Sequence, residues 1–209
     1  MEPSELQALL QQVGAIQQGH FLLSSGMHST HYIQCALLLQ YPRHAERVGR
    51  ALAERFRTAA PSVVIGPAYG GMIVAHEVAR AFDARALFAE RVEGKFELRR
   101  SFTIGAGEPV LVVEDVVTTG SSTLEVRRLA ERQGGRVIGI GALVDRSEGP
   151  LGFDVPFEAL LTIQVDTYIA AVCPLCAAGV PLVKPGSRSP QGPLAATSEA
   201  AERPISFPR

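Results

Sequence analysis

The stretch that decides the fold of this 209-residue chain reads Val110-Leu111-Val112-Val113-Glu114-Asp115-Val116-Val117-Thr118-Thr119-Gly120-Ser121-Ser122-Thr123. Its apolar beginning, from 109 to 113, predicts a buried strand, and residues 121–133, closed by two glycines, predict a helix. Ligands of an open parallel sheet bind beyond the carboxyl ends of its strands. Glu114 and Asp115 stand at such an end, so we expect the functional site here.

The residue types of this loop suit a phosphorylated sugar. Adjacent carboxylates can accept hydrogen bonds from vicinal ribose hydroxyls and offset positive charge that develops on the sugar. Hydroxyl groups, a conformationally free glycine and the unpaired N–H groups of a helix N-terminus together make a site for a phosphate dianion. The alternative, an ordinary strand–helix turn with an acidic edge, suffices for a match of two residues but fits the whole run poorly.

The segments on both sides of this run continue a strand–loop–helix pattern. Ser4 and Gln7 have the spacing of a capping box, and helical periodicity predicts a helix near 4–18. Continuous apolar strands that alternate with helices indicate an α/β fold whose mostly parallel sheet is flanked by helices. The other predicted elements are a hairpin at 20–23 and 31–35, helices at 42–60 and 72–82, and strands at 62–65, 85–89, 136–144 and 159–165.

The chain is long enough for one domain with a small appendage. We expect this domain to span 1–188, with an N-terminal hood at about 1–40 and an α/β core at about 42–172. Residues 91–103, rich in Arg, Lys and Glu, predict a charged and mobile segment. Residues 189–209 are rich in Pro, Ser and Ala, and their low apolar content predicts a disordered tail.

Bulk properties exclude several classes of protein. A formal net charge of -1 and a pI of about 6.5 argue against a protein that holds nucleic acid by bulk charge. We find no secretory signal in the first ten residues and no apolar run that approaches the roughly 18–20 residues of a membrane span. Three cysteines, an odd and small number, fit a reducing compartment, and we expect a cytoplasmic protein.

The pair Cys173 and Cys176 has the spacing of a metal or redox motif, but a lone pair cannot complete a tetrahedral zinc site. We favour two simple thiols over a four-thiolate site shared across a dimer or a redox pair. The histidines show no ligand spacing along the chain. His28 and His31 lie in the predicted hood, where they could approach a bound acceptor, and His76 reads as an ordinary helical residue.

The run from 110 to 123 closely resembles the phosphoribosyl-pyrophosphate (PRPP) motif of the type I phosphoribosyltransferases. The resemblance implies the fold of that family, a parallel sheet with flanking helices and a small N-terminal hood. It also implies that Glu114 and Asp115 bind the ribose hydroxyls and act in catalysis. The remainder of the implied PRPP site in this run consists of Val116, Val117, Thr118, Thr119, Gly120, Ser121 and Ser122, of which the last five bind the 5′-phosphate.

Other segments resemble the orotate phosphoribosyltransferase branch of the family, from about Leu6 to Arg188. Residues 21–26, followed by Tyr32, are similar to its hood, and 66–71, with Tyr69 and Gly70, to its pyrophosphate loop. The resemblance implies that orotate contacts Tyr32, Thr118 and Arg146. A guanidinium offers a fork-shaped partner for the orotate carboxylate. The alternative for Arg146 is a surface ion pair with Asp145 or Glu148.

The chain departs from this branch at several cationic positions. Many of its members carry a lysine where this chain has Gly70, and often one where it has Ser24. In the mobile loop, Arg91 and Lys95 match and inherit an implied catalytic role, whereas Val92 and Glu97 replace a second cation and a histidine. The neighbouring pair Arg99 and Arg100 could supply the missing charge.

The resemblance implies that the chain converts orotate and PRPP to orotidine 5′-monophosphate and pyrophosphate. It implies Mg²⁺ as cofactor, bound mainly through substrate oxygens without dedicated protein ligands. It further implies a homodimer in which the loop of one subunit closes over the site of the other, with small-molecule substrates and neither nucleic acid nor membrane as partner. The alternatives are a purine-base phosphoribosyltransferase and a non-enzymatic PRPP-sensing regulator. The regulator should carry a DNA-binding extension or a basic face, and the sequence shows neither.

Overall fold

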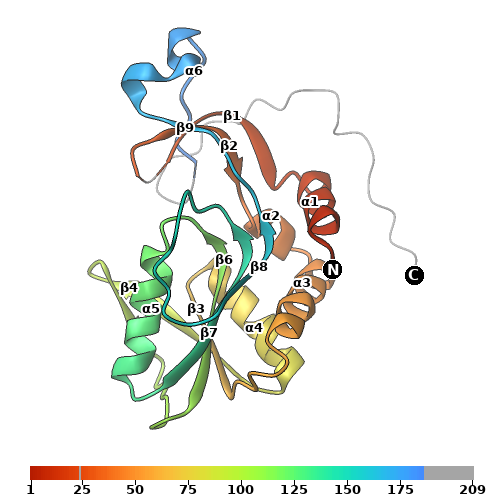
Figure 1. The fold of residues 1–209 in the computed structure, drawn as a ribbon, viewed down its shortest axis with the longest axis vertical. Coiled ribbons are helices and arrows are strands. Elements are labelled where there is room, and N and C mark those ends of the chain that lie inside the picture. Colours follow the sequence, from red (N-terminus) through yellow and green to blue (C-terminus); the bar gives the residue numbers. More distant parts are fainter. Residues whose placement is uncertain (24, 186–209) are drawn as a thin grey trace.

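The structure, a computed structural model, describes residues 1–23 and 25–185; Ser24 and the predicted tail at 189–209 lie outside them. Six strands form the central sheet in the order β5-β4-β3-β6-β7-β8, and all neighbours are parallel except β4 and β5 (Figure 1). The prediction of a mostly parallel sheet is confirmed. The strands are β3 (Val63–Pro67), β4 (Arg85–Val92), β5 (Lys95–Leu98), β6 (Pro109–Val117), β7 (Arg136–Asp145) and β8 (Phe157–Thr162).

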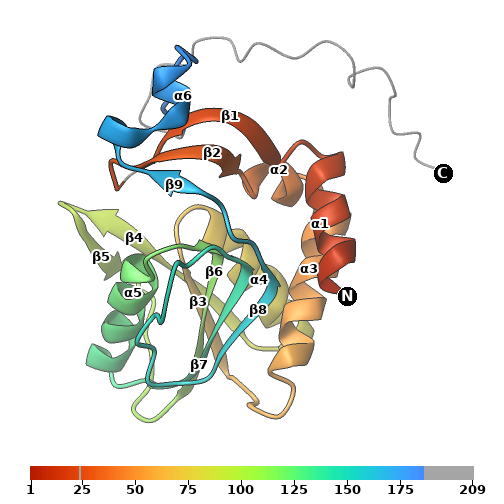
Figure 2. The ribbon, with the colours of Figure 1, turned by 45° about the horizontal axis from the view of Figure 1, so that its top comes forward.

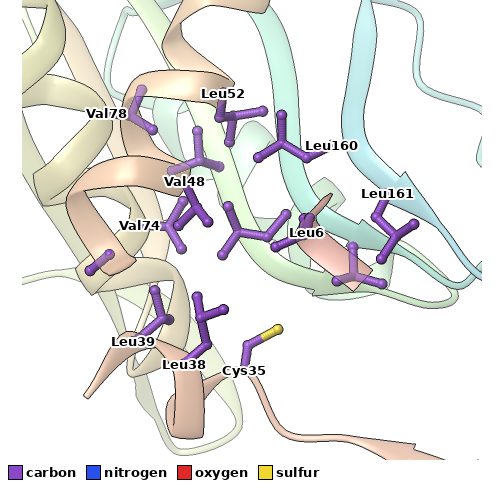
Figure 3. Close-up of a cluster of buried hydrophobic side chains, with 14 of the residues drawn as sticks. Leu6, Cys35, Leu38, Leu39, Val48, Leu52, Val74, Val78, Leu160 and Leu161 are labelled. Atoms are coloured by element: carbon purple, nitrogen blue, oxygen red, sulfur yellow. The ribbon is translucent and has the colours of Figure 1, made fainter. Parts of the chain in front are cut away.

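Helices cover both faces of this sheet, because successive side chains of a buried strand point to opposite faces. Val110 and Val112 of β6 belong to the apolar cluster that contains α5, whereas Leu111 and Val113 belong to the cluster on the other face, drawn in part in Figure 3. Within the described residues, no helix has the length and apolar character to cross a bilayer. The face of Leu111 and Val113 is covered by α1 (Pro3–Gln12), α2 (Ala36–Leu39), α3 (Pro42–Arg55) and α4 (Gly70–Phe82). The face of Val110 and Val112 is covered by α5 (Ser121–Arg132).

A second, antiparallel sheet of three strands, β1-β2-β9, arches over the core (Figure 2). Its strands β1 (Ile16–Leu22) and β2 (His28–Ile33) confirm the predicted hairpin, while β9 (Thr167–Tyr168) enters from the far end of the chain. A 3-10 turn, η1 (Ala170–Val172), and a short helix, α6 (Pro174–Ala177), follow β9. The hood is therefore built from both ends of the described chain.

The first helix differs from its prediction at both ends. α1 begins at Pro3 with Glu2 as the N-cap residue, and no side chain caps it, so the predicted capping box is wrong. Proline suits the first helical position because its missing N–H would have no intrahelical partner there. The helix stops at Gln12 rather than at 18, since Gly14 adopts a φ of 71°, a conformation that ends helices.

The charged segment 91–103 also differs from the predicted loop. Its first part forms a hairpin, in which Arg91 on β4 pairs with Phe96 on β5. The Phe96 ring is buried, and its backbone N–H donates a 2.7 Å hydrogen bond to Glu125 of α5. One aromatic residue within a run of charges is enough to fix this hairpin against the helix.

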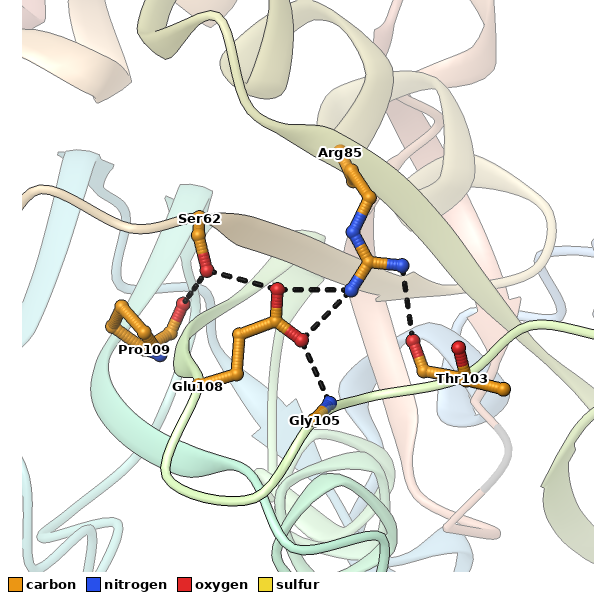
Figure 4. A network of polar contacts seen from close by, with 6 residues as sticks. All are labelled: Ser62, Arg85, Thr103, Gly105, Glu108 and Pro109. Carbon is orange, nitrogen blue, oxygen red and sulfur yellow. Dashed lines mark hydrogen bonds and ion pairs between the residues drawn. The ribbon is translucent and has the colours of Figure 1, made fainter.

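An ionic network ties together the beginnings of β3, β4 and β6, at the end of the sheet away from the hood (Figure 4). The Glu108 carboxylate accepts hydrogen bonds from the Arg85 guanidinium at 2.8 and 2.9 Å, from the Gly105 N–H at 2.8 Å and from the Ser62 hydroxyl at 3.1 Å. The Gly105 N–H and the Arg85 guanidinium lower the pKa of Glu108, and burial partly opposes them. The network aligns three strands whose opposite ends carry the site.

Candidate active site

Two adjacent carboxylates lie near the carboxyl end of the central strand β6. Alternation along β6 buries Glu114, whose exposed fraction is 8%, and leaves Asp115 half-buried beside the cleft. Burial, together with the negative charge of Asp115, raises the pKa of Glu114 well above its usual range. Burial likewise raises the pKa of Asp115. Both acids therefore hold their protons more tightly than free carboxyl groups do, and a cationic or proton-donating ligand at this point of the cleft floor would favour their ionised forms.

A cavity of about 320 Å³ opens above this pair, and the whole loop from Glu114 to Thr123 lines it. Gly120 has a φ of 72°, which lets the chain turn from β6 into α5, and an added Cβ there would press on Phe153. The first N–H groups of α5 face this loop, together with exposed hydroxyls of Thr118, Thr119 and Ser121. This arrangement is suited to an anion such as a phosphate.

The loop after β3 forms the opposite wall. It contributes Pro67, Ala68, Tyr69 and Gly70 to the same cavity, and the Tyr69 side chain is exposed. Gly70, the first residue of α4, packs directly against the Asp115 carboxylate, so an added Cβ would overlap it. The structure thus brings the predicted pyrophosphate loop to the predicted ribose site. A side chain at position 70 would have to displace the Asp115 carboxylate.

A second cavity, of about 850 Å³, continues from the first under the hood. The two share Asp115, Val116 and hydroxyl-bearing residues of the loop, among them Thr118. Tyr32 and Arg146 reach this cavity from β2 and from the end of β7. The structure therefore brings all three residues predicted to contact the acceptor to one continuous cleft.

The charged side chains that line the second cavity are one guanidinium, Arg146, and two carboxylates, Asp115 and Glu148. Arg146 makes no ion pair within the described part of the chain, so the predicted alternative of a salt bridge to Asp145 or Glu148 is not formed. Burial lowers the pKa of its guanidinium, which still stays charged at neutral pH. Burial also raises the pKa of Tyr32, and the negative charge of Asp115 raises it further. The phenol therefore keeps its proton and can act as a hydrogen-bond donor.

The two loop cations occupy different places. Arg91 lines the first cavity, stacks over the Phe96 ring at 4.0 Å from its centroid and pairs with Glu125 at 3.4 Å. Lys95 is exposed on β5 and lines neither cavity. Our sequence reasoning missed Phe96, which positions Arg91, and Thr167 of β9, which lines the second cavity. A lone aromatic residue among charges was the signal for Phe96, whereas Thr167 had none.

Comparisons with known proteins agree with this geometry. A family model described as a phosphoribosyl transferase domain matches residues 36–174. The orotate phosphoribosyltransferase of Caldanaerobacter subterraneus subsp. tengcongensis is 54% identical over 188 residues, which are 90% of this chain and 99% of the relative. That of Thermotoga maritima is 47% identical over 183 residues, 88% of this chain and 98% of the relative.

Solved structures share the fold. The crystal structure of orotate phosphoribosyltransferase from Aeropyrum pernix is 27% identical and has a TM-score of 0.64, covering 76% of this chain and 93% of that one. The enzyme of Mycobacterium tuberculosis H37Rv in complex with PRPP is 25% identical and has a TM-score of 0.59, covering 77% and 95%.

The family model matches more than half of the chain, and the fold, with paired acids at the carboxyl edge of its sheet, agrees with it. This chain belongs to the phosphoribosyltransferase family. Within that family, its similarity to the curated relatives groups it with the orotate phosphoribosyltransferases.

Proposed function

We propose that the chain catalyses transfer of the ribose 5-phosphate group of PRPP to orotate, giving orotidine 5′-monophosphate and pyrophosphate. The observation that carries the proposal is the continuity of the two cavities. A phosphate-type loop, a carboxylate pair and a hood pocket with a free guanidinium line one cleft. This cleft has room for a phosphorylated ribose at one end and an anionic base at the other.

In the first cavity, the loop from Thr118 to Ser122 binds the 5′-phosphate through backbone N–H groups and hydroxyls. Glu114 and Asp115 accept hydrogen bonds from the ribose hydroxyls, with Val116 and Val117 as the backbone between acids and loop. Tyr69 and Gly70 face the pyrophosphate from the opposite wall. No protein nucleophile is required, because positioning and electrostatic stabilisation of an oxocarbenium-like ribose account for the catalysis.

In the second cavity, the acceptor lies between Tyr32 and Arg146, with Thr118 at the junction. The Arg146 guanidinium can donate two parallel hydrogen bonds to the orotate carboxylate. A purine base lacks this carboxylate and would leave the half-buried guanidinium without a partner, which disfavours the purine alternative.

The donor atoms around the first cavity fit Mg²⁺. They are carboxylate and hydroxyl oxygens, the ligands that this ion prefers, and the burial of Glu114 leaves most coordination positions to substrate oxygens and water. When bound, Mg²⁺ offsets the negative charge of the departing pyrophosphate. Asp115 and Glu114 hold the ribose end in place beside it.

The exposed position of Lys95 supports a homodimer in which each hairpin serves the partner's cleft. Arg91 is held in its own subunit by Phe96 and Glu125, whereas Lys95, beside the turn of the hairpin, lines neither cavity of that subunit. A two-fold dimer can bring the hairpin of one subunit to the cleft of the other, where Lys95 would act on the pyrophosphate.

Three cysteines without a disulfide support a cytoplasmic, reducing environment.

One assay tests the activity. Orotate absorbance should fall when protein, PRPP and Mg²⁺ are combined, and should not fall when any one is left out. Adenine, hypoxanthine and uracil serve as competing acceptors. Consumption of a purine in preference to orotate would overturn the assignment, and PRPP binding without any turnover would favour the regulator.

A further inference from the structure

Four side chains with nitrogen or sulfur ligand atoms meet in the hood, away from the residues that line the cleft. His20 comes from β1, His28 from β2, Cys173 from the turn before α6, and Cys176 from α6 itself. One ligand atom of each lies within 4.8 Å of all the others. His20, His28 and Cys173 are buried, and Cys176 is exposed. Along the chain only the cysteine pair has ligand spacing, because the histidines lie about 150 residues from the cysteines.

The spacing of these atoms is close to that of a tetrahedral metal site. Zinc bonds of about 2.0–2.1 Å to nitrogen and about 2.3 Å to sulfur place neighbouring ligand atoms roughly 3.3–3.8 Å apart. The His20 Nε2 atom lies 3.5 Å from the Cys173 Sγ atom and 3.7 Å from the Cys176 Sγ atom. The Cys176 Sγ atom lies 3.3 Å from the His28 Nδ1 atom. The two histidine nitrogens are 2.8 Å apart, so an ion would have to separate them slightly.

The outer hydrogen bond of His20 also suits a metal ligand. The His20 Nδ1 atom lies 2.8 Å from the Val180 carbonyl oxygen. A carbonyl oxygen can only accept, so Nδ1 carries the proton and donates it, and Nε2 presents its lone pair to the cluster. Metal-binding histidines typically donate their second ring N–H to a backbone carbonyl or carboxylate in this way.

The segment that carries the cysteines has little else to hold it. Neither η1 nor α6 contains a buried residue, and Ile169, Val172 and Leu182 are exposed. Besides the His20–Val180 hydrogen bond, the described links of this segment to the hood are the short pairing of β9 with β2 and two hydrogen bonds between Val183 and β1. A small lobe without its own core commonly depends on a metal or disulfide for its stability.

We propose that His20, His28, Cys173 and Cys176 bind one zinc ion in a tetrahedral structural site, which fixes residues 169–183 to the β1–β2 hairpin. Two histidines complete the site within one chain, so no thiols from a second subunit are needed. Without an ion, the two imidazoles would share the 2.8 Å hydrogen bond and the cysteines would be simple thiols beside them. The site is chemically separate from Mg²⁺, which prefers oxygen ligands. Because β9 also carries Thr167, the ion would steady one wall of the second cavity.

Metal analysis of the full-length protein, purified without a histidine tag and with zinc in the medium, tests this. We expect about one zinc per chain in the wild type and almost none in Cys176→Ala or His20→Gln. Matched controls are Cys35→Ala, at a cysteine buried beside Asp115, and His44→Gln, in α3; both should retain the metal. Cobalt substitution should give the visible bands of a tetrahedral Co²⁺–thiolate site.

Melting temperature provides a second readout that does not depend on activity. Cys176 is exposed, so without a metal its replacement by alanine should change the melting temperature little. With the metal, Cys176→Ala and chelator-treated wild type should both melt several degrees lower, by the same amount, and Zn²⁺ but not Mg²⁺ should restore the wild type. The proposal would be overturned if the wild-type protein contained no zinc and gave no cobalt–thiolate spectrum. It would also be overturned if both Cys176→Ala and His20→Gln retained zinc. A Cys173–Cys176 disulfide in freshly purified protein, detected by thiol titration, would have the same effect.

Discussion

Gly70 lies so close to Asp115 that any side chain at position 70 would overlap the Asp115 carboxylate. This contact joins the loop after β3 to the end of β6, the two segments that form opposite walls of the first cavity. A lysine at this position, which the resembled enzymes often carry, could enter only if the loop or the acid moved. A side chain at position 70 would therefore have to displace the Asp115 carboxylate.

Gly70→Ala tests the importance of that contact. The added methyl group should displace Asp115 or the loop, and we expect kcat/KM for PRPP to fall on the order of 10²-fold, the cost of misplacing a catalytic group by about 1 Å. Steady-state kinetics at saturating orotate measure the effect. Gly105→Ala is the control, since its added Cβ meets only ordinary contacts. Unchanged kinetics in Gly70→Ala would show that the position of Asp115 tolerates such displacement.

Asp115→Asn should separate activity from stability. Removal of a charge aimed at the ribose should lower kcat/KM on the order of 10²-fold. Burial raises the pKa of Asp115, so the folded state binds this proton more tightly than the unfolded chain, and the ionised carboxylate costs stability at neutral pH. We therefore expect the variant to melt at or above the wild-type temperature at pH 8.

The melting advantage of Asp115→Asn should shrink as the pH falls toward 3.8, the ordinary pKa of the carboxyl group. Calorimetry between pH 3 and pH 8 measures this trend. Asp83→Asn, at a left-handed helix end where asparagine is well tolerated, is the control and should leave both kinetics and melting near wild type. An Asp115→Asn variant with full activity would mean that the acid is structural.

Arg146→Ala should act on the acceptor alone. A hydrogen bond between charged groups contributes about 1.5–3 kcal/mol to binding. Its loss should raise the KM for orotate roughly 10- to 100-fold, with a much smaller change in the KM for PRPP. Arg146→Lys should recover only part of the loss because it lacks the planar fork. Arg136→Ala, at the exposed start of β7, is the matched control. A selective increase in the KM for PRPP would place Arg146 at the wrong end of the cleft.

Mixed dimers test whether Lys95 serves the partner's site. Lys95→Ala and Asp115→Asn should each be nearly inactive alone. In a hybrid dimer, the Lys95→Ala subunit keeps its acids and receives an intact hairpin from its partner, so one of its two sites is complete. Random mixing makes about half of the dimers hybrid, and roughly a quarter of wild-type activity should return. Hybrids confirmed by native mass spectrometry but without activity would place Lys95 outside the reaction or within its own subunit.

Glu108→Gln should destabilise the fold without touching the cleft. The pKa of Glu108 is lowered from its ordinary value of 4.5, so its contribution is present above that value and is lost as the pH falls through the folded-state pKa. Replacement by glutamine should cost on the order of 1–2 kcal/mol at pH 7, a drop of about 2–8 °C in melting temperature. The difference from wild type should shrink progressively as the pH falls below 4.5. Glu97→Gln, on the exposed face of β5, is the control and should melt like wild type at each pH.

The sequence by itself determined most of the central sheet, without β5, and most of the cleft. Every residue that specifies the phosphate loop and the acid pair lies in one run from 110 to 123, and one strand followed by one turn forces these residues together. The same holds for Tyr69 and Gly70, which follow β3, because adjacent parallel strands end at the same edge. Local order along the chain was sufficient here.

Tertiary structure decided what depends on contacts between distant segments. The hairpin at 91–98 is held against α5 by the hydrogen bond from the Phe96 N–H to Glu125. The strand β9 joined the hood from the far end of the chain. The convergence of His20 and His28 with Cys173 and Cys176 likewise required the folded hood, since no periodicity or spacing along a chain records which of its distant segments will pack together.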